Sequence, residues 1–291
     1  MLAVGAGVYG LFVAPAGTAG NARLPRRLLL GAMAGALLLL AAGPLDIATA
    51  VGRLLGRFES SFFWQYLQST RHGSATLYRT GLAVALPVTL LVRPANLSRL
   101  LFVLVSTLLL ATFSWTSHSA AMGGNVPLLA DLVHFGAAGA WAGSIMYAAW
   151  SRPTKAGASG EGAAVREVGR LSALGLWAVL LLFGTGIYLA LLHLTEPAVL
   201  TESDYGRAFI VKLVFIAAVL AVAAFNRFWL VPAVERGERL DTFRNFLRGE
   251  TLLLLGVIVA TAVLTTSSLP HEPGDPTPLQ NLQNFLRWSG G

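Results

Sequence analysis

A short segment near the middle of the chain holds the side chains best suited to bind a metal. His118 and Met122 lie in one polar break, and Asp131 and His134 follow early in the next apolar stretch. Imidazole and thioether groups are ligands for transition metals, and a carboxylate can orient an imidazole by accepting its ring proton. Asp131 and His134 are spaced i, i+3 and would share one face of a helix. The segment therefore predicts a metal site with His118 and His134 as principal ligands, Met122 as a further ligand and Asp131 as the orienting group.

Each of these residues also has a structural interpretation, which the sequence leaves open. An ionisable pair inside a membrane is costly and favours a functional role, but Asp131 and His134 could instead form an interhelical hydrogen-bonded link. His118 could cap a helix at the membrane interface. Met122 could be an interfacial hydrophobic residue.

The composition places this segment in a membrane. Of 291 residues, 55% are hydrophobic and only 12% are charged, whereas soluble domains carry about 25% charged residues. A helix needs about 20 mostly apolar residues to cross a bilayer, and continuous apolar runs indicate helices rather than barrel strands. The sequence therefore predicts an all-α, polytopic transmembrane helix bundle of about eight spans, near residues 2–16, 28–50, 74–92, 97–116, 127–150, 171–194, 207–231 and 249–268.

The distribution of basic residues predicts how the bundle is oriented. Lys and Arg concentrate in the breaks after the first, third, fifth and seventh spans, which the positive-inside rule assigns to the cytoplasm. Both termini are then expected on the periplasmic side. The formal net charge of +7 is explained by these loops, not by a nucleic-acid partner. All five histidines fall in the outer half, which makes His193, at the outer end of the sixth span, another possible ligand.

The remaining segments complete the predicted organisation. Residues 1–268 are expected to form a single transmembrane domain, followed by a periplasmic tail at 269–291. The break at 51–73 mixes aromatic and basic residues, which suits an amphipathic helix on the outer surface. The Gly- and Ala-rich break at 151–170 is typical of a flexible linker.

Several kinds of chemistry are absent from the sequence. There is no cysteine, so disulfides and thiolate sites are excluded. No phosphate-binding loop, kinase motif set or hydrolase nucleophile elbow is found. We therefore expect a protein that is not an enzyme, and any transport must use a gradient or a partner.

With these motifs in place, the chain resembles the copper resistance protein D family of bacterial inner-membrane proteins. The resemblance covers about residues 97–268, and the spans before it match only in hydropathy. Ser117 and Ser144 stand where the family pattern has Gly. The matching elements, in the family's order, are Ser-His-Ser-Ala at 117–120, Asp131-x-x-His134, Trp141-x-Gly143, Asp-Tyr-Gly-Arg at 204–207 leading to Lys212, and Asn226-Arg227.

The resemblance implies copper handling in the bacterial inner membrane. It implies a copper ion as the bound species, capture from the periplasm with movement toward the cytoplasm, and a periplasmic copper-binding protein as a possible partner beside the lipid bilayer. Two other functions stay open at this stage. Paired histidines on neighbouring helices also hold b-type haem in electron-transfer proteins, and the chain could be a non-catalytic membrane subunit.

Overall fold

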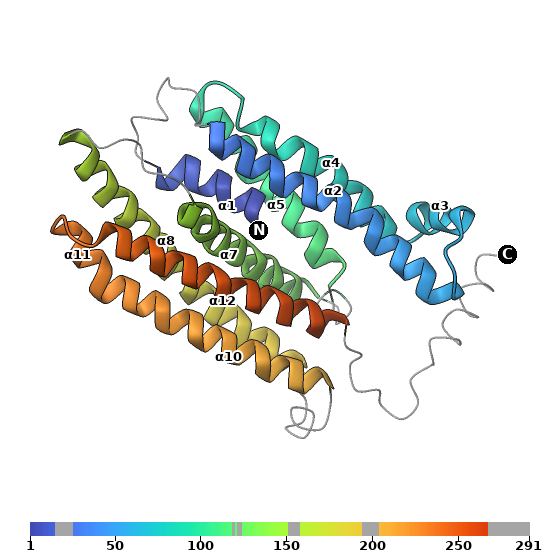
Figure 1. Cartoon of the computed structure of the whole chain (residues 1–291). Helices are drawn as coiled ribbons and strands as arrows, with labels where there is room; N and C mark the ends of the chain where they lie inside the picture. The colour runs from blue at the N-terminus through green and yellow to red at the C-terminus, as the bar shows by residue number, and fades with distance from the viewer. Residues whose placement is uncertain (15–25, 118–119, 121–123, 151–157, 194–203, 267–291) are drawn as a thin grey trace.

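The computed structural model describes residues 1–14, 26–117, 120, 124–150, 158–193 and 204–266, and within these ranges it is helical without strands. The helices lie side by side and form one bundle (Figure 1). Their bounds are α1 Leu2–Val8 continuing as η1 Tyr9–Val13, α2 Arg26–Leu55, α3 Ser60–Ser69, α4 Arg71–Thr89, α5 Ala95–Trp115, α7 Asn125–Trp150, α8 Ala158–His193, α10 Asp204–Phe225 continuing through η3 Asn226–Leu230 and α11 Val231–Glu235, and α12 Leu240–Thr266.

All eight predicted apolar stretches are helical over most of their length. Six helices in the described part of the chain are long and apolar enough to cross a membrane: α2, α5, α7, α8, α10 with its extension through α11, and α12. The first stretch forms the shorter apolar helix Leu2–Val13. The third forms α4, which carries Arg71, His72 and Arg79 and is less apolar. The all-α transmembrane architecture is therefore confirmed, with six candidate spans among the described residues beside α1 and α4.

Large apolar side chains on the outside of the bundle fit a lipid environment. Leu38, Trp177, Leu191, Val214 and Leu252 are each more than 60% exposed. Water-soluble proteins rarely expose so many large apolar side chains over a continuous surface. The protein is thus a multi-pass membrane protein, in which these side chains contact lipid.

Small residues hold α1 against its two neighbours. A Cβ atom added at Gly5 or at Gly143 would collide with the backbone of the other helix, and Ser144 Oγ donates a hydrogen bond to the Gly5 carbonyl at 3.2 Å. On α2, a Cβ at Gly35 would meet Ala3. Gly35 of α2 and Gly143 of α7 therefore allow close packing of α1, as small-residue faces do in membranes.

The two ends of the bundle differ in charge. The turns between α4 and α5 and between α11 and α12 lie at one end, which we call the basic end because it carries Arg93, Arg99, Arg236, Arg239 and Arg244. At the opposite end α3 lies across the tips of α2 and α4 (Figure 1). It packs Leu67 against Ile47 and Val51 of α2. The predicted amphipathic surface helix is present as Ser60–Ser69.

Two helices begin earlier than predicted. Residues 158–170, expected as part of a flexible linker, are the first turns of α8, and α12 begins at Leu240 instead of near 249. Hydropathy marks the part of a helix that lies in lipid, whereas these early turns are polar. They still contain good helix formers: Ala, Glu and Arg at 158–170, and Leu and Arg at 240–248. The tail at 269–291 lies outside the described residues.

Candidate functional site

The two central ionisable residues lie on α7, near the end opposite the basic end. Asp131 is 7% exposed, and His134 is partly buried one turn further along. From the start of α7 at Asn125, these positions are about 9 and 14 Å along the axis, at about 1.5 Å per residue. The side chains are therefore below the mouth of the bundle, within the expected membrane span.

Thr185 of α8 is the hydrogen-bond partner that the structure gives the His134 ring. The His134 Nδ1 and Thr185 Oγ1 atoms are 3.0 Å apart, and the same hydroxyl donates to the Leu181 carbonyl at 2.6 Å. A hydroxyl has one proton, so Thr185 Oγ1 must accept from Nδ1–H. The neutral ring then carries its free electron pair on Nε2, the nitrogen left available to a metal.

A third helix contributes charge to this group. Lys212 on α10 interacts electrostatically with both Asp131 and His134. Asp131 thus supplies a negative charge that offsets the ammonium beside the imidazole. We refer to Asp131, His134, Thr185 and Lys212 as the α7 cluster, since two of its members are on α7. Thr185 could not be found from sequence spacing, because it lies on another helix 51 positions away.

The other predicted ligands are placed only in part. His118 and Met122 lie outside the described residues. The helices on either side of this segment, α5 and α7, are antiparallel neighbours, and the Phe113 and Phe135 rings are 6.3 Å apart. His193 is the last residue of α8, about 12 Å along the axis beyond Thr185 at about 1.5 Å per residue. Within the described part of the chain no group of three or more His, Cys, Asp or Glu side chains could hold a metal.

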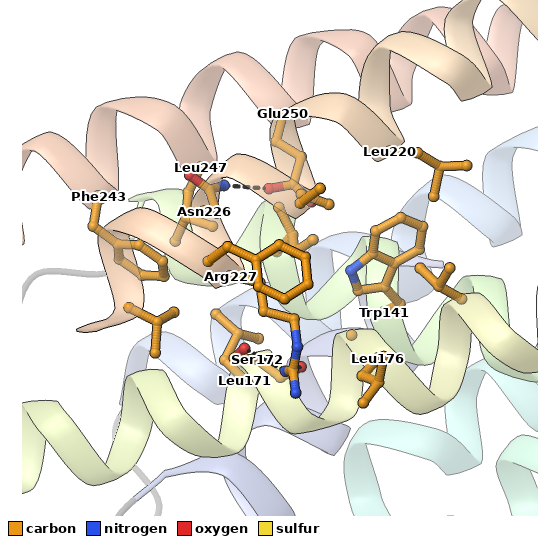
Figure 2. Close-up of a pocket in the computed structure, with 17 residues that line it drawn as sticks. Trp141, Leu171, Ser172, Leu176, Leu220, Asn226, Arg227, Phe243, Leu247 and Glu250 are labelled. Atoms are coloured by element: carbon orange, nitrogen blue, oxygen red, sulfur yellow. Dashed lines mark hydrogen bonds between the residues drawn. The ribbon is translucent and has the colours of Figure 1, made fainter. Parts of the chain in front are cut away.

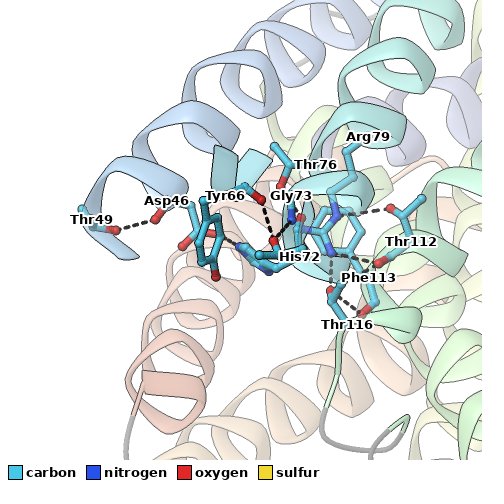
Figure 3. A network of polar contacts seen from close by, with 11 residues as sticks. Asp46, Thr49, Tyr66, His72, Gly73, Thr76, Arg79, Thr112, Phe113 and Thr116 are labelled. Atoms are coloured by element: carbon cyan, nitrogen blue, oxygen red, sulfur yellow. Dashed lines mark hydrogen bonds and ion pairs between the residues drawn. The ribbon is translucent and has the colours of Figure 1, made fainter. Parts of the chain in front are cut away.

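A second imidazole–carboxylate pair lies under α3 at the same end (Figure 3). His72 Nε2 and Asp46 Oδ2 are 2.9 Å apart, and the Tyr66 ring stands edge-on to His72 with centroids 6.4 Å apart. Burial, followed by the nearby Asp46 carboxylate, raises the pKa of the Tyr66 hydroxyl. The pair is half exposed and ties α2 to α4.

Arg79 of α4 fastens the end of α5 next to the segment that carries His118. Its guanidinium donates to the Thr112 carbonyl at 2.8 Å and to the Thr116 hydroxyl, and it lies 4.2 Å from the Phe113 ring centroid. Figure 3 shows these contacts around the Arg79 guanidinium. The arginine therefore links α4 to the end of α5.

A pocket of about 310 Å³, lined mostly by apolar side chains, lies between α7, α8, α10 and α12, toward the basic end. Asn226 Nδ2 donates to Glu250 Oε2 at 2.8 Å on one wall, and Arg227 donates to the carbonyl and hydroxyl of Ser172 at 3.1 and 2.8 Å on another. Trp141 of α7 borders the same space (Figure 2). Glu250 was not predicted as a site residue because its helix was expected to begin at about 249, which placed it at a surface.

Two sequence models of one family match the chain. The model for the copper resistance protein D-like N-terminal domain matches residues 1–128, and the model for copper resistance protein D matches residues 165–264. The matched residues therefore include the first three apolar stretches, in which none of the family motifs described above lies.

Two curated relatives are similar over much of the chain. The inner membrane protein YebZ of Escherichia coli (strain K12) is 27% identical over 177 residues, which cover 60% of each chain. Copper resistance protein D of Pseudomonas syringae pv. tomato is 29% identical over 224 residues, which cover 70% of this chain and 71% of that one. The chain thus spans 60 to 71% of the length of these relatives. No solved structure matches it.

Proposed function

This chain belongs to the copper resistance protein D family, and from that premise we propose that it captures copper at the periplasmic face of the bacterial inner membrane and moves it toward the cytoplasm. Its relatives are named for the inner membrane and for copper resistance. In this proposal the end opposite the basic end faces the periplasm, which follows from the positive-inside rule.

The orientation of His134 is the observation that carries the proposal. With Nδ1 donating to Thr185, Nε2 can bind a metal without any change of tautomer. Neutral imidazole is a common copper ligand, and an outer partner that fixes the ring raises its ligand strength. His118 would be the second principal ligand, and Met122 and His193 would add ligands nearer the mouth.

Charge balance also supports entry of a cation at this point. The Lys212 ammonium alone would repel a copper ion approaching His134, but Asp131 interacts with the same ammonium. Because the two charges offset each other, the α7 cluster presents no net positive charge. Asp131 would in addition steer the positions of both neighbouring side chains.

The chain itself offers no means of using ATP, so copper would move down a gradient or with a coupled ion. A periplasmic copper-binding protein would be a suitable source of the copper ion, because little copper stays free in solution where ligands for it are abundant. The metal is the cargo in this proposal, and the ligands must be able to release it.

The test measures copper accumulation in cells and copper bound to the purified protein, for the wild type and for His134→Ala. We expect both quantities to fall in the variant, because its principal imidazole is lost. His72→Ala is the matched control, since it removes an imidazole at the same end of the bundle that is paired with Asp46 away from the α7 cluster. It should behave like the wild type.

Two results would contradict the proposal. Unchanged accumulation and unchanged metal content in His134→Ala would exclude His134 as a ligand. A haem absorption band in the purified wild type that disappears in His134→Ala would replace copper by haem at this position.

A further inference from the structure

The pocket toward the basic end contains a hydrogen bond that is missing one partner. Asn226 is 5% exposed and Glu250 is 2% exposed. The amide nitrogen of Asn226 donates to Glu250 Oε2 at 2.8 Å, but its oxygen, Oδ1, is buried with no hydrogen-bond partner among the described residues. A buried polar atom without a partner is energetically costly, so we expect a hydrogen-bond donor at Asn226 Oδ1.

The surroundings restrict what that donor can be. Among the described residues that line the pocket, only Arg227 and Glu250 are ionisable. The Arg227 guanidinium is turned to Ser172 on α8, away from the amide (Figure 2). Arg248, two positions before Glu250 on α12, donates to the Ala149 carbonyl of α7 and does not line the pocket. Apart from Ser172 and Trp141, the other lining residues are apolar and have no side-chain proton to donate to the Asn226 amide oxygen.

Ser172 and Trp141 lie on other parts of the pocket wall. The Ser172 hydroxyl accepts from Arg227 at 2.8 Å on the opposite wall. The Trp141 indole nitrogen lies against α8, where a Cβ added to Gly175 would be 3.2 Å from it. Neither is bonded to Asn226 among the described contacts, and the donor must therefore come from the pocket itself or from Glu250.

A protonated Glu250 supplies that donor. A carboxylic acid and a primary amide pair through two hydrogen bonds, one from the amide N–H to the acid C=O and one from the acid O–H to the amide C=O. The first bond is present between Asn226 and Glu250. The second requires only a proton on the carboxyl group.

We propose that Glu250 and Asn226 form a reversible proton-binding site in the half of the membrane nearer the basic end. The proton is bound by a carboxyl oxygen of Glu250 and shared with Asn226 Oδ1. When it leaves, no atom other than the proton is transferred, and the carboxylate keeps the bond from Asn226 Nδ2. Arg227 is then the nearest positive charge among the lining residues.

The backbone at Asn226 adds independent support. The helix from α10 changes at this residue to the π-helical turn η3, Asn226–Leu230. Single π-helical turns inside longer helices occur frequently at functional sites. Here the turn places Asn226 and Arg227, neighbours in the chain, on different walls of one pocket.

The site can be connected to the proposed function through α7. Trp141 borders the pocket and lies about 10 Å along α7 from His134, at about 1.5 Å per residue. A chain without ATP-binding motifs needs a coupled ion for uphill transport, and a proton at Glu250 would be that ion. This coupling step rests on the proposed copper transport, whereas proton binding itself does not.

Infrared difference spectroscopy of the purified full-length protein, recorded between acidic and alkaline buffer, tests proton binding directly. We expect a protonated-carboxyl C=O band in the wild type that is absent in Glu250→Gln and shifted in Asn226→Leu, which removes the hydrogen-bonding amide. Glu235→Gln is the matched control, because Glu235 is an exposed carboxylate at the end of α11. Its spectrum should keep the band. A wild type without such a band, or a band that persists in Glu250→Gln, would overturn the proposal.

Copper uptake into proteoliposomes tests the coupling. With the wild type, an imposed pH gradient should change the initial rate at least several-fold, and with Glu250→Gln the gradient should have no effect. Equal gradient dependence in both proteins would overturn the coupling. If neither protein transports copper, the proposed function fails while the infrared band still decides whether Glu250 binds a proton.

Discussion

The Nδ1 atom of His134 is hydrogen-bonded to Thr185. This bond leaves Nε2 as the ring nitrogen that is available to a metal. The Thr185 hydroxyl donates its one hydrogen to a hydrogen bond with the Leu181 carbonyl at 2.6 Å, so it can only accept from the ring. The backbone of α8 also lies close to the ring, because a Cβ added to Gly186 would be 3.4 Å from His134 Cε1. The ring is thus held by a hydroxyl on one side and a glycine beside it.

Removal of the Thr185 hydroxyl should weaken copper binding without removing any ligand. For Thr185→Val we expect copper affinity to fall about 10- to 100-fold, the usual effect of losing a group that orients a metal ligand. The measurement is equilibrium copper binding to the purified protein. Thr261→Val is the control, since the Thr261 hydroxyl likewise donates to a carbonyl one turn back, that of Val257, but on α12. Equal affinities in the two variants would count against the orienting role.

At the scale of whole helices, the packing of α1 between α2 and α7 depends on residues without side chains. The backbones of Gly5 and Gly143 approach so closely that neither position has room for a Cβ atom. Gly136 is on the same helix as Gly143, but a Cβ atom added to it would meet no neighbouring side chain of the described residues within 4 Å. α7 thus contains one glycine that packing requires and one that it does not.

These two glycines give a matched pair of variants. Gly143→Ala should lower the free energy of unfolding by about 1–3 kcal/mol, as overpacking of a tight contact does. Gly136→Ala should leave it unchanged or raise it by up to about 1 kcal/mol, because Ala favours helix over Gly. Thermal unfolding in detergent measures both. A Gly143→Ala protein as stable as Gly136→Ala would show that α1 can move away from α7.

The helices could be predicted from sequence more reliably than their contacts. The stretch predicted at 97–116 is α5, Ala95–Trp115, because a continuous apolar run both enters lipid and forms a helix. Glu250 was not predicted as a buried residue, because polar turns of a helix do not stand out in hydropathy. The polar first turns of α12 begin at Leu240, so Glu250 lies in the interior and not at a helix end. Its partner Asn226 is on another helix, and no spacing rule connects them.

The metal site shows the same difference between features of a single helix and contacts between helices. Asp131 and His134 could be grouped by their shared helix face, and the α5–α7 hairpin followed from the short break between the two helices. Thr185 came into the group only through the packing of α8 on α7, and Lys212 through its electrostatic interaction with Asp131 and His134. The ligand roles of His118, Met122 and His193 stay predictions.

For the molecule as a whole, the separation of charge between the two ends predicts its orientation in the membrane. The chain has no cysteine, so a thiol reagent labels only a cysteine that is introduced. Its labelling shows on which side of the membrane that residue lies. Gln68 on α3 and Glu238 in the turn between α11 and α12 are both exposed and lie at opposite ends of the bundle. A membrane-impermeant maleimide should label Gln68→Cys in spheroplasts and label Glu238→Cys only after the membrane is permeabilised. The reverse pattern would place the α7 cluster at the cytoplasmic face and contradict capture from the periplasm.

The π-helical turn at Asn226–Leu230 also limits how this part of the chain can change in length. Such a turn holds one residue more than an α-helical turn, and one residue corresponds to about 100° of rotation around a helix. Deleting a residue from this turn would let the backbone return to α-helix at little cost. The pocket residues before it, such as Leu220, and after it, such as Val231, would then no longer point into the same space. Apart from Asn226 and Arg227, the residues of this turn should therefore accept substitutions more readily than insertions or deletions of a single residue.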